Sequence, residues 1–286
     1  MAFKNLLELV FTSQNREITM NDKISEFNVI SVEGLESSQY TIKSVDSNQD
    51  GTIVTCRKIE PREIRIIGDI EKNDNEDFNR RLLISFFNPK FDDGLLKVNR
   101  NNNKRKIPYE VSSFKFTNTN MYEPTEFEIV LECPNPYFES IDNYGKNIAN
   151  ITRQFAFPLV ILGGKGKIMG YKTYNNNVQL LNDGDCETGC EIRIKALSDV
   201  SNPKILLNNK FVQVNTKMEF GDELVINTNE RKKSITLNGQ NLIQRINRKS
   251  TFFSLNVGDN VMKYGSDEGY QDMEIYVYFY KKFLGV

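Results

Sequence analysis

Arg62-Glu-Ile-Arg-Ile-Ile67 alternates polar and apolar residues with the period of two that is typical of a half-buried β-strand. The same alternation recurs in three further runs, at residues 127–131, 191–195 and 274–280. Turn-forming pairs such as Asp50-Gly51 and Asn238-Gly239 separate the runs at short spacing, which favours hairpins over the long crossovers of βαβ units. The sequence therefore predicts a mainly β fold and argues against a parallel, doubly wound sheet.

Residues 75–88 break the strand pattern and predict one helix. Its apolar residues recur at the spacing of a helix face: Phe78, Leu82, Leu83, Phe86 and Phe87. Asn73 or Asp74 is placed to cap the start of the helix, and Pro89 blocks its continuation. Since an apolar helix face must pack on something, the N-terminal half is expected to be a sheet with a helix laid against it.

The length of 286 residues favours two domains, at roughly 150 residues per domain. The proline-rich stretch Cys133-Pro-Asn-Pro136 does not suit a central strand, and the polar residues 142–147 follow it. These features predict a boundary that separates residues 1–145 from residues 146–286. The second part is expected to consist almost entirely of strands and turns.

Composition excludes several classes of function. The chain has no histidine and no tryptophan, and nucleophilic triads, His-ligated zinc and two-His iron sites all need imidazole. The net charge is −1, from 37 Lys and Arg against 38 Asp and Glu, so the protein as a whole does not attract nucleic acid or an anionic membrane. Glu8 interrupts the N-terminal apolar run and Pro158 the run at 155–162, so neither an export signal nor a membrane-spanning helix is expected.

Three motifs resemble ligand sites, and each has a simpler interpretation. Cys186-Glu-Thr-Gly-Cys190 would need the distant Cys56 and Cys133 to complete a zinc site, and reduced, unpaired thiols are favoured. Asp46-Ser-Asn-Gln-Asp-Gly51 copies the start of a calcium loop but places Arg57 where the bidentate Glu belongs, so a hairpin turn is favoured. Gly163-Gly-Lys-Gly-Lys167 lacks the phosphate-loop spacing and is interpreted as a flexible loop.

The densest basic cluster surrounds Asn101-Asn-Asn103 and consists of Lys97, Arg100, Lys104, Arg105 and Lys106. Such a cluster can contact phosphates or an acidic partner, although a solvated hairpin tip is the favoured interpretation. Asn150-Ile-Thr152 fits a glycosylation acceptor, which is discounted because no secretory signal is expected. Two carboxylates suffice for glycoside hydrolysis, but the sequence does not single out such a pair. No catalytic, cofactor-binding or metal-binding residue is therefore assigned.

Longer strings carry a family resemblance. In the first half they are Pro61-Arg-Glu-Ile-Arg-Ile-Ile-Gly68, Phe86-Phe-Asn-Pro89, Gly94-Leu-Leu96 and Leu131-Glu-Cys-Pro-Asn-Pro-Tyr-Phe138. In the second half they are Phe155-Ala-Phe-Pro158, Asn202-Pro203, Gly221-Asp-Glu-Leu-Val-Ile-Asn-Thr228, Ser250-Thr-Phe-Phe-Ser-Leu255, Gly258-Asp-Asn260 and Tyr280-Lys-Lys-Phe-Leu-Gly-Val286. In their order and spacing these strings resemble the phage distal tail proteins, which are the baseplate hub proteins of tailed phages of Gram-positive bacteria.

The resemblance implies a structural protein of two domains. Residues 1–145 would form an N-terminal β-sandwich-like domain with one helix that assembles into a homohexameric ring, and residues 146–286 a galectin-like β-sandwich. The ring would join the tail tube protein to the tail-tip or tail-fibre protein at the virion tail tip, after assembly in the host cytoplasm. No enzyme activity, cofactor, membrane or sequence-specific nucleic acid is implied, although DNA would pass through the ring of a phage. A headless, tail-like bacteriocin would use the same part.

Ring contacts are expected from the N-terminal strands and the hairpin at 96–108, with the basic tip facing the lumen. Because galectins bind sugar through histidine and tryptophan, no galectin-type lectin activity is expected. The alternative function is a cell-wall saccharide-binding module in the second half, where aromatic side chains are available at Tyr171, Tyr174, Tyr264 and Tyr270. A cell-wall glycosidase is the third and least favoured interpretation.

Overall fold

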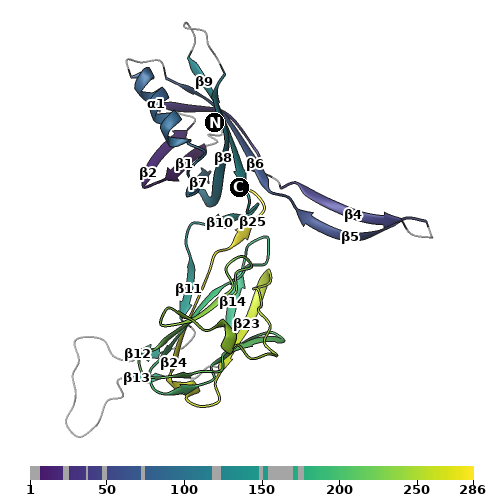
Figure 1. The fold of residues 1–286 in the computed structure, drawn as a ribbon, viewed down its shortest axis with the longest axis vertical. Helices are drawn as coiled ribbons and strands as arrows, with labels where there is room; N and C mark the ends of the chain where they lie inside the picture. The colour runs from purple at the N-terminus through teal and green to yellow at the C-terminus, as the bar shows by residue number, and fades with distance from the viewer. Residues whose placement is uncertain are drawn as a thin grey trace, which may run out of the picture. The chain divides into compact units, whose positions relative to one another are not determined.

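The computed structural model describes residues 7–21, 26–36, 38–46, 50–71, 75–117, 124–147, 151–153, 170–172 and 177–286. The chain divides into two compact units, drawn in Figure 1. The first unit comprises Met1–Ile141 together with Lys282–Val286, and the second comprises Asp142–Lys281. The described residues form strands and a single α-helix, α1, so the predicted mainly β fold is confirmed.

In the first unit, seven strands form a sheet that closes on itself. In order of hydrogen-bonded neighbours they are β1 (Leu7–Ser13), β2 (Arg16–Asn21), β3 (Phe27–Glu33), β6 (Arg62–Ile70), β9 (Thr125–Cys133), β8 (Asn103–Phe116) and β7 (Gly94–Arg100), and β7 pairs with β1. Strand β8 pairs with β7 through its first half and with β9 through its second, with a register shift between Val111 and Ser113. Because a bulge lets a strand bend, β8 can turn this corner and close the sheet.

Helix α1 (Glu76–Phe86) packs on the core of this closed sheet. Leu83, Phe86 and Phe87 are buried, and the Phe87 ring lies 5.3 Å from that of Phe11 in β1, measured between centroids. The predicted helix is thus confirmed, and it ends three residues before Pro89. One part of the prediction is wrong: Phe78 is 67% exposed, because only the C-terminal half of the apolar face reaches the core.

The start of α1 also differs from the expectation. Asn75 occupies the N-cap position, and its side chain makes no capping hydrogen bond. Asn73 and Asp74, the predicted capping residues, lie outside the described residues. The two acidic residues of the first turn, Glu76 and Asp77, carry the favourable charge for that end of the helix dipole.

Two strands that follow β3 and precede β6 in the sequence form a separate two-stranded sheet, β4 (Tyr40–Asp46) and β5 (Thr52–Ile59). We call this hairpin the arm. The register pairs Asp46 with Thr52, and Gly51 has a φ of +102°, which favours glycine. The hairpin predicted at Asp50-Gly51 is confirmed, although residues 47–49 lie outside the described part of the chain. Figure 1 shows the arm extending away from the sheet of its unit.

The second unit is a sandwich of two sheets. One sheet has the order β11 (Tyr144–Asn147), β24 (Met273–Phe279), β15 (Glu191–Ala196), β20 (Glu223–Asn227), β21 (Ser234–Leu237) and β22 (Gln240–Asn241). The other has the order β14 (Asn177–Asn182), β23 (Gly258–Gly265), β17 (Lys204–Leu207) and β18 (Lys210–Gln213). Alternate side chains of both sheets, such as Ile194 in β15 and Met262 in β23, meet in one buried core.

Short elements complete the second unit. They are the strand pairs β12 (Ile151–Arg153) with β13 (Gly170–Lys172) and β16 (Val200–Ser201) with β19 (Lys217–Met218), and the 3-10 helices at Ile243–Arg245 and Tyr270–Asp272. At the tight turn between β21 and β22, Asn238 and Gly239 both have positive φ, as the sequence pair predicts.

Residues 282–286, which we call the return segment, belong to the first unit. Strand β25 (Lys282–Phe283) pairs with β10 (Phe138–Ser140), which in turn pairs with β8. Beyond the strand, the Val286 N–H donates to the Leu35 carbonyl over 3.1 Å. A Cβ on Gly285 would lie 2.2 Å from the Glu36 carbonyl oxygen, so the backbone approach requires glycine.

Arg62, at the start of β6, holds the return segment in place. Its side chain is only 2% exposed, and its guanidinium donates to the carbonyls of Pro136, Gly34 and Leu284 and to the Ser38 hydroxyl. The guanidinium also lies 4.9 Å from the centroid of the Phe138 ring. One buried cation thus ties residues 282–286 to three other parts of the first unit.

Candidate functional site: an assembly surface

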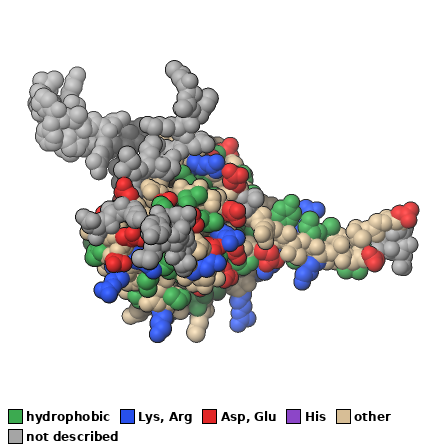
Figure 2. All heavy atoms as spheres, turned by 90° about the horizontal axis from the view of Figure 1, so that it is seen from above, with side chains coloured by type: hydrophobic (Ala, Val, Ile, Leu, Met, Phe, Trp, Pro, Cys, Tyr) green, Lys and Arg blue, Asp and Glu red, His purple; other side chains and the backbone are tan. Residues whose placement is uncertain are grey.

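The arm exposes several large apolar side chains to solvent. Every residue of β4 is exposed, as is every residue of β5 except Ile59. The large apolar side chains on it are Tyr40, Ile42, Val45, Ile53 and Val54, of which Tyr40 is 71% exposed. Figure 2 shows several of these hydrophobic side chains along the arm as it extends from its unit. Contiguous exposed apolar surface of this kind marks a site of interaction with other macromolecules.

The apolar side chains lie on both faces of the arm. The register places Ile42 opposite Arg57 on one face, and Val45 opposite Ile53 on the other, since successive residues of a strand point to opposite sides. A two-stranded hairpin is at best marginally stable alone in water. The distribution of apolar side chains over both faces therefore suits a segment that other protein surfaces cover from two sides.

Open strand edges point to the same segment. Strands β1, β2 and β7 each have a hydrogen-bonded neighbour on both sides, whereas β4 and β5 have only each other among the described residues. An unpaired edge is a template for pairing with another chain. From the sequence, ring contacts were predicted at the N-terminal strands and at residues 96–108, because open strand edges were expected there. In the structure, the same reasoning from open edges favours residues 40–59.

A row of glutamates crosses three strands near the base of the arm. Glu63 in β6 is directly opposite Glu132 in β9, and Glu132 is directly opposite Glu110 in β8. All three are exposed, and within the described part of the chain none of them forms an ion pair. We call these three residues the acidic row. Like charges directly opposite one another destabilise a sheet, so the row lowers the stability of the isolated chain.

A cleft of about 440 Å³ opens beside the acidic row. Its lining is mostly polar and consists of Glu33, Gly34, Gln39, Pro61, Arg62, Glu63, Arg65, Ser112 and Glu132. Glutamates from β3, β6 and β9 thus converge on this cleft, and the two arginines that line it already have partners in the chain. The cleft is suited to a cationic group.

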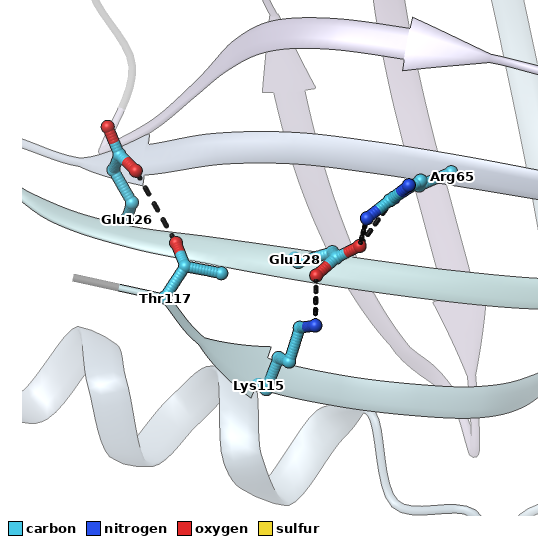
Figure 3. A network of polar contacts seen from close by, with 5 residues as sticks. All are labelled: Arg65, Lys115, Thr117, Glu126 and Glu128. Carbon is cyan, nitrogen blue, oxygen red and sulfur yellow. Dashed lines mark hydrogen bonds and ion pairs between the residues drawn. The ribbon is translucent and has the colours of Figure 1, made fainter.

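Further along the same strands, Glu128 forms the centre of a polar network, shown in Figure 3. Its carboxylate is 2.6 Å from Lys115 Nζ in β8 and contacts the Arg65 guanidinium in β6. Separately, Thr117 donates a hydrogen bond to Glu126 over 3.4 Å on the same two strands. The hydrogen bond from Lys115, followed by that from Arg65, holds the pKa of Glu128 below its ordinary value. Two cations on neighbouring strands therefore neutralise this carboxylate, in contrast to the acidic row.

Replacing Glu128 with glutamine is expected to lower the melting temperature at neutral pH, because Arg65 and Lys115 then face each other without the carboxylate. A carboxyl group whose folded pKa is lowered stabilises the protein above its unfolded pKa, and loses that contribution as pH falls through the folded pKa. The difference between wild type and variant should therefore shrink in acid. Thermal unfolding followed by circular dichroism from pH 7 to pH 3 measures it, and a difference that does not change with pH would contradict it.

The structure places the basic cluster on the β7–β8 hairpin, whose turn residues Asn101 and Asn102 have positive φ. The predicted hairpin is thus confirmed. Most of its cations have partners within the chain: Lys97 lies 3.8 Å from Glu17 and Arg100 lies 2.9 Å from Glu36. Arg105 donates to the Gly285 carbonyl and lies 3.8 Å from the centroid of the Phe283 ring. This cluster therefore partly serves to hold the return segment.

The other candidates from the sequence do not converge on a site. All four cysteines are free thiols, and the described residues contain no group of three or more cysteine or acidic side chains placed to hold a metal ion. Tyr264 is buried and Tyr270 is exposed. Gly163–Lys167, Asn150, Tyr174 and the side chain of Tyr171 lie outside the described residues. No helix in the described part of the chain has the length and apolar character needed to span a membrane.

Comparison with known proteins supports a role in a phage tail. Residues 183–282 match the family described as siphovirus-type tail component, C-terminal domain. No curated protein matches the chain. The crystal structure of SPP1 Dit (gp 19.1), described as a paradigm of hub adsorption apparatus in Gram-positive infecting phages, is similar with a TM-score of 0.70 and 12% identity, covering 96% of this chain and 99% of that chain.

Two baseplate structures are also similar. The phage P2 baseplate in its activated conformation with Ca gives a TM-score of 0.52 at 12% identity, covering 98% of each chain. The phage p2 baseplate with Sr gives 0.50 at 11% identity, covering 95% of this chain and 97% of that chain. At such low identity these structures establish a shared fold. Together with the family match, they confirm the predicted resemblance to phage distal tail proteins.

Proposed function

We propose that this chain, which has the fold of a phage distal tail protein and carries a siphovirus-type tail component domain, is the structural hub of a phage baseplate. In this role it forms a ring, a homohexamer, that connects the tail tube protein to the tail-tip or tail-fibre protein at the tip of the virion. The chain has a structural and not a catalytic role, and DNA passes through the ring without sequence-specific contacts. Assembly takes place in the cytoplasm of the host.

The observation that carries this proposal is the likeness over the whole chain to a hub protein, combined with an arm that is unsuited to a monomer. A ring is a cyclic assembly in which each subunit presents two different surfaces. The arm supplies one of them, because its apolar faces and open edges need a cover. Within the division predicted from the sequence, residues 1–145 form the ring and the galectin-like residues 146–286 do not, except that the return segment lies with the first unit.

Light scattering on the purified protein, followed by negative-stain imaging, tests the proposal. Particles of about six times the chain mass of 33.1 kDa, with a central hole, are expected. Since such a ring can also close only on a partner protein of the tail, the protein is measured alone and together with the tail tube protein of the same tail. A monomer under both conditions, or turnover of purified peptidoglycan, would contradict the structural role. Binding to cell-wall saccharide by the monomer would favour the alternative function.

A further inference from the structure

Among the described residues, no glutamate of the acidic row forms an ion pair. Its three glutamates lie in register across β6, β9 and β8, where directly opposite Cβ atoms are about 4.5–5.5 Å apart. The neighbouring Glu128 has two cations, Lys115 and Arg65. The same outer surface of the sheet thus neutralises one carboxylate completely and leaves three others without an ion pair among the described residues. A cationic partner would relieve this repulsion.

The arm carries cations that suit this row. Lys43 in β4 is opposite Cys56 in β5, and Lys58 is opposite Thr41, so both lysines lie on the same face as Val45 and Ile53. Lys58 makes only an exposed contact with Glu60, at 3.4 Å, and its side chain is 66% exposed. By contrast, Lys97, Arg100 and Arg105 of the β7–β8 hairpin are held by partners within the chain.

Reach and geometry are compatible with a contact between copies. The eight residues of β5 span about 26 Å at roughly 3.3 Å per residue, which is enough to extend beyond the chain's own sheet. Lys43 and Lys58 are diagonal neighbours on the two strands of the arm, about 7–8 Å apart, and their long flexible side chains let both ammonium groups reach the glutamates that lie side by side across β6, β9 and β8. A head-to-tail ring needs two unlike surfaces on each subunit.

We propose that the arm of one copy binds, through its lysine-bearing face, to the acidic row of the next copy. Lys43 and Lys58 pair with Glu63, Glu110 and Glu132, while Val45 and Ile53 are removed from water at the same contact. This inference rests on the proposed ring and specifies which surfaces build it. The occupant of the acidic row is therefore a second copy of this chain.

Charge reversal tests the pairing. We expect Glu63→Lys with Glu110→Lys and Glu132→Lys to abolish assembly, and Lys43→Glu with Lys58→Glu to do the same. Combining all five substitutions in one chain should restore it, because each interface then pairs reversed charges. Glu219→Lys with Glu230→Lys, at exposed sites of the second unit, is the matched control and should assemble as wild type does. Full assembly by either reversed variant alone would overturn the proposal.

Crosslinking provides a readout that does not depend on the stability of the reversed variants. Cys56 is exposed on the lysine-bearing face, whereas burial raises the pKa values of Cys133 and Cys190 to about 12 and makes them slow to react. One chain keeps Cys56 and the other carries Cys56→Ser with Ser112→Cys at the cleft, and both carry Cys186→Ser. A short bismaleimide should join the two chains only when they are mixed, and less so in 1 M salt, where the screening length falls to about 3 Å.

The outcomes separate the two proposals. Six-subunit particles without a crosslink between these two positions would overturn the docking site and leave the ring intact. A crosslinked pair supports the docking site. If the protein does not assemble, either alone or with the tail tube protein, and the crosslink does not form, both the ring and the docking site are overturned.

Discussion

Replacing Arg62 with alanine is expected to lower the free energy of unfolding of the first unit by about 3 kcal/mol or more. The side chain is buried, and its guanidinium donates to three carbonyls and one hydroxyl. Each buried acceptor left without its donor costs about 1–3 kcal/mol. Since one of these acceptors is the Leu284 carbonyl, the substitution also releases the return segment.

Urea unfolding followed by circular dichroism measures the loss of stability, and hydrogen exchange at residues 282–286 measures the release. Arg57→Ala provides the matched control, because Arg57 is exposed on the arm and an exposed substitution changes stability by about 0.5 kcal/mol or less. Arg62→Lys keeps the charge but loses the fork of donors, and should lie between the two. Unchanged exchange at 282–286 in Arg62→Ala would show that another contact holds the return segment.

Replacing Ile42, Val45 and Ile53 with threonine is expected to prevent ring formation while leaving the melting temperature of the monomer nearly unchanged. The three side chains are exposed in the single chain, so their replacement removes little internal packing beyond the cross-strand pair of Val45 and Ile53. Threonine keeps the β-branched shape that suits a strand, so the arm itself should persist. In the ring these residues would be covered, where burial of each side chain contributes about 1.5–3 kcal/mol per subunit contact, and threonine loses part of that contribution.

Sedimentation velocity, under conditions in which wild type assembles, measures the effect on the ring. Phe220→Thr is the matched control, because Phe220 is 78% exposed in the second unit and lies outside the proposed contact. It should assemble as wild type does. If the triple variant also formed full-sized particles, the apolar faces of the arm would have no part in ring closure.

Local patterns predicted the elements well. Alternation at 62–67 became β6, and the four-residue spacing of apolar residues at 82–87 became the buried side of α1. The exposure of Phe78 was not predictable, because a helix face indicates what can be buried and not how far the neighbouring sheet extends. The return of residues 282–286 to the first unit was also not predictable, because a strand of two residues is too short to show an alternation of polar and apolar residues.

The candidate site was the hardest part to predict. Residues 40–46 and 52–59 have the alternation of an ordinary hairpin, and nothing in it shows that neither face meets a core. The acidic row depends on the pairing of β6 with β9 and of β9 with β8, which brings together glutamates separated by up to 69 positions in the sequence. Register between distant strands is set by the whole sheet, so a single sequence does not reveal it.

The position of the return segment orders events during synthesis. Residues 282–286 are translated only after every residue of the second unit. Until then the first unit lacks strand β25 and the carbonyl groups to which Arg62 and Arg105 donate. A nascent chain interrupted anywhere between residues 142 and 281 carries an incomplete first unit. Such a chain lacks the carbonyl groups of Leu284 and Gly285 to which Arg62 and Arg105 donate, so we expect it to be a poor building block for a ring.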